Sequence, residues 1–141
     1  MRCISYVNCT NGVRLEFMRE TDLPECGVAR FLLLFDGPWA TLIVRELMHG
    51  PQRFGQLREA LPGISAHTLT NRLRMFEARG LVTRTSYAEI PPRVVYELTE
   101  LGWSLRSVLD AMYEWGMTAP ASTFIAAPVL EGGGRSVKKG T

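Results

Sequence analysis

The sequence has few of the residues from which metal sites and disulfide frameworks are built. Its three cysteines, Cys3, Cys9 and Cys26, form no Cys-x-x-Cys pair, and the only histidines are His49 and His67. A structural zinc site needs about four such ligands at close spacing, so none is predicted. An odd number of cysteines also argues against a disulfide framework. We therefore expect no metal ion and no cofactor.

Long apolar runs are absent as well. The longest, residues 31–35, falls far below the roughly 18–20 residues of a membrane-spanning helix. Residues 1–10 carry an arginine but lack the apolar core of a signal peptide. We expect no membrane association and a cytoplasmic location. The sequence also shows no Ser–His–Asp set and no glycine-rich phosphate loop, so no enzyme activity and no catalytic residue are expected.

Lysine is missing from residues 53–98, although cations are not. This stretch holds seven arginines and four glutamates, a net charge of +3, while the whole chain of 141 residues carries only +2. The rigid fork of arginine suits phosphates and guanine edges. On charge alone, an ordinary solvated surface explains the pattern equally well.

The chain divides into three segments by pattern. Residues 1–24 form an N-terminal extension, residues 25–116 a domain, and residues 117–141 a flexible tail rich in Ala, Pro, Gly and Ser. Residues 13–17 alternate between apolar and charged, as a short strand does. Met18 is an alternative translation start, in which case residues 1–17 would not belong to the native protein.

Apolar residues at helical spacing predict helices over 25–35, 39–48 and, briefly, 54–61. A fourth helix is predicted to begin at an N-cap on Ser65 and to end at Gly80. Its buried stripe consists of Leu69, Leu73 and Phe76. Glycine and proline punctuate the gaps between these helices.

A hairpin and a last helix follow. Residues 81–87 and 94–98 are rich in Val, Thr and Tyr, as strands are, and Pro91 and Pro92 belong at the tip between them. Thr99 is the predicted N-cap of one long helix that ends at Gly116. The predicted fold class is α+β, mainly α: a winged helix-turn-helix with flanking dimerisation helices.

The face of the fourth helix opposite its buried stripe favours DNA binding. It presents short donors and acceptors, has no lysine, and has no acidic residue before Glu77. Asn can pair with adenine and Arg with guanine in the major groove. The candidate DNA-binding residues, which include the helix cap and cations expected to meet phosphates, are Arg53, Ser65, His67, Thr68, Thr70, Asn71, Arg72, Arg74 and Arg93. The alternative is a solvated helix face and ordinary surface charges.

The chain resembles the HxlR-type family of winged-helix transcriptional regulators, relatives of the MarR group. The matching elements between Cys26 and Gly116 are Gly37-Pro38-Trp39, Leu47, Gly50-Pro51-Gln52-Arg53-Phe54, Leu61-Pro62-Gly63-Ile64-Ser65, Leu69-Thr70, Glu77, Gly80-Leu81-Val82, Pro91-Pro92-Arg93-Val94, Tyr96, Leu98-Thr99, Leu101-Gly102 and Trp115-Gly116. The Pro-Pro-Arg-Val-x-Tyr-x-Leu-Thr run is the most specific of them.

The resemblance implies a homodimer on double-stranded DNA that carries a roughly palindromic operator. Its half-sites would lie about 34–36 Å apart. The first and last long helices would form the dimer interface, and the candidate residues are Phe31, Leu34, Leu105, Met112 and Trp115. The alternative for each of them is a place in the monomer core.

Cys26 matches an N-terminal cysteine of the family that some members are thought to use to sense oxidants or electrophiles. Gly27 replaces the proline that usually follows, which weakens the match locally. A reactive thiol needs a lowered pKa, and the alternative is an inert, half-buried residue. An oxidant or small-molecule effector is therefore one expectation. The competing hypothesis for the whole protein is a winged-helix module that binds proteins and not specific DNA.

Overall fold

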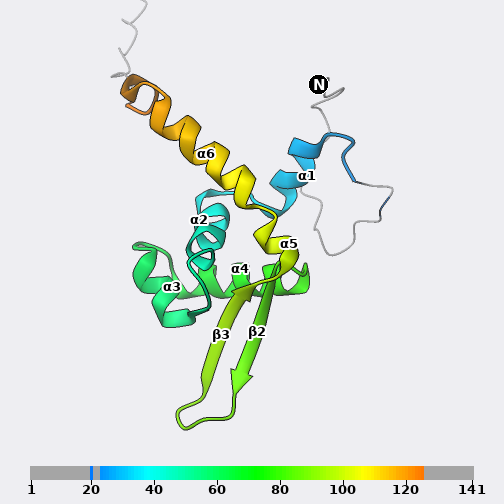
Figure 1. Ribbon diagram of the computed structural model, residues 1–141, viewed down its shortest axis with the longest axis vertical. Helices are drawn as coiled ribbons and strands as arrows, with labels where there is room; N and C mark the ends of the chain where they lie inside the picture. The colour runs from blue at the N-terminus through cyan, green and yellow to red at the C-terminus, as the bar shows by residue number, and fades with distance from the viewer. Residues whose placement is uncertain (1–19, 21–22, 126–141) are drawn as a thin grey trace, which may run out of the picture. The chain divides into compact units, whose positions relative to one another are not determined.

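The structure is a computed structural model that describes residue 20 and residues 23–125. Its elements are α1 (Gly27–Leu34), α2 (Pro38–Leu47), β1 (Gln52–Arg53), α3 (Phe54–Ala60), α4 (Ala66–Ala78), β2 (Val82–Tyr87), β3 (Arg93–Leu98), α5 (Glu100–Trp103), α6 (Arg106–Thr118) and the 3-10 turn η4 (Ala121–Thr123) (Figure 1). The strand predicted over residues 13–17, the alternative start at Met18 and the tail beyond residue 125 lie outside the described residues.

The core is built around α2. Four residues of this helix, Ala40, Ile43, Val44 and Leu47, are essentially inaccessible to solvent. The predicted stripe of α4 is confirmed, because Leu69, Leu73 and Phe76 are all fully buried against the same cluster. Leu57 of α3, Leu61 just after that helix, and Val82 and Leu98 at the bases of β2 and β3 also belong to it. Burial of this apolar area is the main favourable term that holds α4 in place.

A three-stranded antiparallel sheet, ordered β1-β3-β2, flanks the helices. Strands β2 and β3 pair from Val82 with Leu98 to Tyr87 with Arg93. This β2–β3 hairpin, called the wing below, projects away from α2, α3 and α4 (Figure 1). Residues 91 and 92 lie in the predicted connection, but Arg93, expected at the tip, is instead the first residue of β3.

One feature of the sheet was beyond the reach of sequence patterns. Strand β1 has only two residues, too few to show the alternation that marks a strand, and it pairs Gln52 with Tyr96. The cap of α4, by contrast, is as predicted: the hydroxyl of Ser65 accepts a hydrogen bond from the Thr68 N–H at 3.0 Å. Gly80 follows the helix with φ 74°, a conformation that favours glycine.

The single last helix predicted from the sequence is wrong. The Thr99 cap is confirmed, since its Oγ1 accepts from the Gly102 N–H at 3.1 Å, but the helix it starts is only the four-residue α5. A turn at residues 104–105 separates α5 from α6, and Leu105 packs against the core there. Helical spacing continues across this break, so periodicity alone conceals it. Helix α6 also continues to Thr118, past the predicted boundary at Gly116.

The described residues from Asp110 onward, 110–125, belong to a second compact unit. Within it, the rings of Trp115 on α6 and Phe124 meet edge to face, with centroids 6.2 Å apart. Such pairs add stabilisation beyond the apolar area they bury.

Within the described residues, no individual helix is both long and apolar enough to cross a membrane. Only a pair of helices, α1 with α2, meets the length and composition criteria together, and the two are bent by 81° at their junction.

Candidate nucleic-acid interface

Helix α4 presents a polar stripe to solvent. His67, Asn71 and Arg74 are exposed and follow at intervals of four and three residues, so they share one side of the helix, opposite Leu69 and Leu73. Arg74 makes no hydrogen bond or ion pair with any described residue. The Asn71 amide nitrogen lies 3.0 Å from Nε2 of His67. The stripe therefore offers one unengaged guanidinium beside a coupled amide and imidazole.

The flanks of this stripe are less accessible. Thr68 and Thr70 are half-buried, and the Ser65 hydroxyl, itself exposed, donates to Oγ1 of Thr68 at 2.8 Å. The Ser65 hydroxyl thus uses both its O–H donor and one acceptor lone pair in hydrogen bonds to Thr68. A shallow hollow of about 280 Å³ lies along this flank, and His67, Thr68, Asn71, Arg72 and Met75 line it.

Arg72 differs from the other candidates on α4. Its Nη1 donates to the Asp36 carboxylate at 2.5 Å and its Nη2 donates to the Asp36 carbonyl oxygen at 2.9 Å. Its side chain is only 22% exposed. The structure therefore places Arg72 against the turn between α1 and α2 and away from the exposed stripe. No local pattern predicts this pair, because its members stand 36 positions apart.

The guanidinium of Arg93 is also engaged within the protein. Its Nη2 donates to Oε1 of Glu89 at 2.7 Å, and its carbon lies 4.1 Å from the centre of the Tyr87 ring. Its Nε is buried and has no hydrogen-bond partner in the part of the chain that the structure describes. Arg93 thus folds back on the wing, where the sequence suggested a cation that reaches outward.

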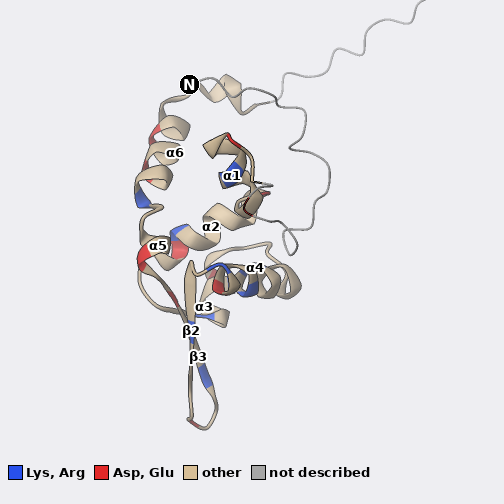
Figure 2. Ribbon diagram, turned by 90° about the vertical axis from the view of Figure 1, so that its right-hand side faces the viewer, with Lys and Arg blue, Asp and Glu red and all other residues tan. Residues whose placement is uncertain are grey.

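Register shows which cations share a face of the sheet. Arg53 is opposite Val95 on β3, and residues two apart on a strand point to the same side, so Arg53 and Arg93 lie on one face. Arg84 is opposite Tyr96 and lies on the other. Arg53 is exposed, and its backbone N–H donates to the side chain of Gln56 at the start of α3. Figure 2 shows basic residues on both α4 and the wing.

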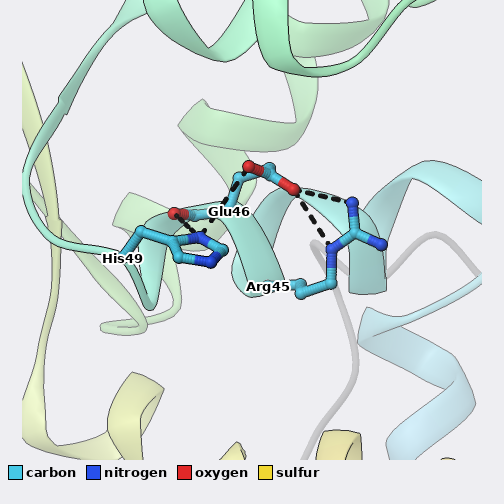
Figure 3. A network of polar contacts seen from close by, with 3 residues as sticks. All are labelled: Arg45, Glu46 and His49. Carbon is cyan, nitrogen blue, oxygen red and sulfur yellow. Dashed lines mark hydrogen bonds and ion pairs between the residues drawn. The ribbon is translucent and has the colours of Figure 1, made fainter. Parts of the chain in front are cut away.

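A separate charged cluster lies at the end of α2 and is shown in Figure 3. Oε1 of Glu46 accepts from Nε and Nη2 of Arg45 at 3.1 and 2.6 Å, and Nδ1 of His49 lies 3.8 Å from Oε2. Glu46 is thus paired although its side chain is only 15% exposed. It lies outside the exposed stripe of α4. No group of three or more His, Cys, Asp or Glu side chains suited to a metal occurs among the described residues.

The candidate dimer residues fall into two groups. Phe31, Leu34 and Leu105 are half-buried and pack against the monomer core. Met112 and Trp115 on α6 are 47% and 63% exposed. The first three thus already contribute to the fold of one chain, and the last two offer apolar surface that the described residues do not cover.

The candidate sensor Cys26 is the N-cap residue of α1, one position before the helix. It is half-buried, and its carbonyl oxygen accepts from the N–H of Arg30 at 3.0 Å. It forms no disulfide with any described residue.

A helix that exposes a polar, cationic stripe beside a two-stranded wing defines a winged helix-turn-helix protein. The family model of HxlR-like helix-turn-helix proteins matches residues 34–122. The chain belongs to this family and is a transcriptional regulator with a helix-turn-helix domain.

Individual relatives agree. The chain is 47% identical to the HTH-type transcriptional regulator sll1512 of Synechocystis over 91 residues. This match covers 64% of this chain and 67% of that protein. A putative MarR-family regulator from Porphyromonas gingivalis superposes with a TM-score of 0.66 at 34% identity, over 72% of this chain and all of that one. The reduced redox regulator HypR gives a TM-score of 0.62 at 36% identity, over 65% and 91%. Diamide-treated YodB of Bacillus subtilis gives 0.56 at 33%, over 73% and 97%.

Proposed function

We propose that this protein is a sequence-specific regulator that binds a pseudo-palindromic operator as a homodimer. The observation that carries the proposal is the exposed stripe of His67, Asn71 and Arg74 on a helix whose other side is locked into the core. Such a helix can enter the major groove without unfolding, with an amide and a guanidinium that suit adenine and guanine. Each bidentate pair typically discriminates between bases by about 1–3 kcal/mol.

The remaining candidates would fix the register on the duplex. Arg53 suits a backbone phosphate, and Thr68 and Thr70 on the flanks of α4 suit phosphates or thymine methyls. Glu89 competes with a phosphate for Arg93, because its carboxylate accepts from Nη2 and neutralises the guanidinium, so we propose a full phosphate contact in which Arg93 exchanges Glu89 for the phosphate. We keep Arg93 as a wing contact on this condition.

Dimerisation is supported by the exposed apolar side chains of α6, of which Met112 and Trp115 were the predicted ones. The similar MarR-family and redox regulators support it as relatives of the same fold. Two copies of α4 would then read half-sites about one turn of DNA apart.

The signal that releases DNA is proposed to be an oxidant or electrophile, or else a small molecule. The similarity to the redox regulator HypR and to diamide-treated YodB supports the first. Cys26 is the candidate sensor because it precedes α1, where the amides of a helix N-terminus favour a thiolate.

Selection of bound duplexes from a random-sequence library tests the proposal. We expect a consensus with two inverted half-sites, and binding to it that weakens steeply with salt. Equal affinity for the selected duplex and for a scrambled duplex of the same composition would contradict a specific regulator. That result would favour the protein-interaction module, the alternative reading of the fold.

A further inference from the structure

Two adjacent contacts join the end of α1 to α4. The rings of Phe35 and Phe76 have centroids 5.7 Å apart, and the next residue, Asp36, holds Arg72 through both its carboxylate and its carbonyl oxygen. Residues 72 and 76 are four apart, so they lie one above the other on the same side of α4. Phe35 and Asp36, which are consecutive in the chain, thus contact consecutive turns of α4.

The two hydrogen bonds from Arg72 to Asp36 fix the orientation of the guanidinium. A planar guanidinium that donates two hydrogen bonds to one residue is fixed in orientation as well as in distance. Gly37, directly after Asp36, has φ 75°, and a Cβ built on it would lie 3.8 Å from Nη2 of Arg72. The turn therefore closes around this side chain, and Arg72 cannot rotate toward solvent without giving up both bonds.

We propose that Arg72 is a positioning residue for base reading. By holding Asp36 it fixes the rotation of α4 about its own axis, and so fixes where Asn71 and Arg74 point, while its own guanidinium does not bind DNA. This inference rests on the DNA-binding function proposed above and assigns Arg72 a different part in it.

Aromatic contacts next to the Asp36–Arg72 pair connect α4 to α1. Phe31 stacks on Phe35 with centroids 4.5 Å apart, and Phe35 in turn meets Phe76 of α4. Because α1 is one of the proposed dimer helices, the Asp36–Arg72 contact would also set the pose of each α4 relative to its copy in the partner. Base readout is sensitive to such shifts, since hydrogen bonds weaken steeply when their geometry is lost.

The experiment compares Asp36→Asn, Arg72→Lys and Arg72→Ala with the control Arg53→Ala, at the cation proposed to contact a backbone phosphate. Each protein is titrated with the duplex selected by the wild type and with its scrambled counterpart, over a range of salt concentrations. We expect Asp36→Asn and Arg72→Ala to lower the selected-to-scrambled affinity ratio roughly tenfold, with Arg72→Lys in between, and to leave the salt slope of scrambled binding unchanged. Arg53→Ala, which removes a proposed phosphate contact, should reduce that slope by about 1.

Two results would overturn the proposal. One is a loss of about 1 in the slope for Arg72→Ala, or a gain in affinity and slope for Asp36→Asn, because either shows that Arg72 contacts phosphate. The other is an unchanged ratio of selected-to-scrambled affinity in both Asp36→Asn and Arg72→Ala. Melting curves identify a variant that has lost its fold; Asp36→Asn, which is nearly isosteric, then carries the test together with Arg72→Lys. A wild type that does not distinguish the two duplexes contradicts the proposed function itself and is seen before any variant is made.

Discussion

Gly102 of α5 lies directly against the main chain of Leu81. A Cβ built on Gly102 would overlap the carbonyl oxygen of Leu81 and would stand 2.9 Å from Cδ2 of Leu98. The same carbonyl accepts a hydrogen bond from the N–H of Thr99 at 3.0 Å. The base of the wing and the start of α5 are therefore fitted to each other at a point where only glycine has room.

We expect Gly102→Ala to destabilise the fold by at least about 1–3 kcal/mol, because a buried backbone carbonyl cannot move aside as a side chain can. Urea unfolding measures the effect. Gly116→Ala is the matched control, since nothing lies within 4 Å of its Cβ position and it stands inside α6. Alanine is favoured there by up to about 1 kcal/mol, so equal losses in the two variants would contradict the packing explanation.

Leu73→Ala should lower the free energy of unfolding by about 2–5 kcal/mol, because Leu73 is 1% exposed in the core beneath α4. Its near neighbour Arg74 is exposed, so Arg74→Ala should leave stability within about 0.5 kcal/mol. Binding to the selected duplex should show the reverse: Arg74→Ala and Asn71→Ala weaken it and alter base preference. A large stability loss in Arg74→Ala would show that the stripe is structural.

Glu89→Gln should strengthen DNA binding by up to about fivefold and raise the salt slope by about 1, because it releases Arg93 for a phosphate. Arg93→Ala should weaken binding with little change of base preference. Titration over a salt series measures both.

Glu97→Gln is the control for Glu89→Gln, since it removes the same charge from the same hairpin and Glu97 has no ion pair with any described residue. An equal gain in the two variants would assign the effect to net charge and not to the release of Arg93.

Diamide should release the wild-type protein from the selected duplex if Cys26 is the sensor. Cys26→Ser should abolish this response and leave binding under reducing conditions unchanged. The double variant Cys3→Ser/Cys9→Ser is the matched control and should respond as the wild type does. Release of Cys26→Ser by diamide would eliminate Cys26 from this role.

Met112→Glu should weaken the dimer, because it would bury a charge in the proposed apolar interface. Met117→Glu adds the same charge on the opposite side of α6, five residues further along, and Met117 is 69% exposed. Sedimentation equilibrium should show dissociation of the first variant alone. Equal behaviour of the two would place the interface elsewhere.

Much of the structure of α4 and the wing can be predicted from local sequence patterns. The Ser65 cap, the stripe of Leu69, Leu73 and Phe76, the glycine after α4 and the two strands of the wing were predicted and are confirmed. Each depends on residues within a turn or two of one another. The hydrophobic period and the capping hydroxyl are therefore visible in the sequence itself.

The errors have a common physical origin. The break between α5 and α6 occurs where Leu105 packs against the core, and β1 exists because β3 offers Gln52 and Arg53 an edge to pair with. Neither cause is local, so neither leaves a period or a turn signal in the sequence.

The sequence by itself determined which helix is proposed to read DNA, because burial of one side of α4 dictates what the other side displays. Only the tertiary structure decided which of its cations are available. Arg72 and Arg74 are two residues apart and chemically identical, yet Asp36 holds one and no described residue holds the other. A guanidinium that is already paired with a carboxylate of its own chain interacts less with a phosphate or base. The distance from each arginine to such a carboxylate is set by long-range folding.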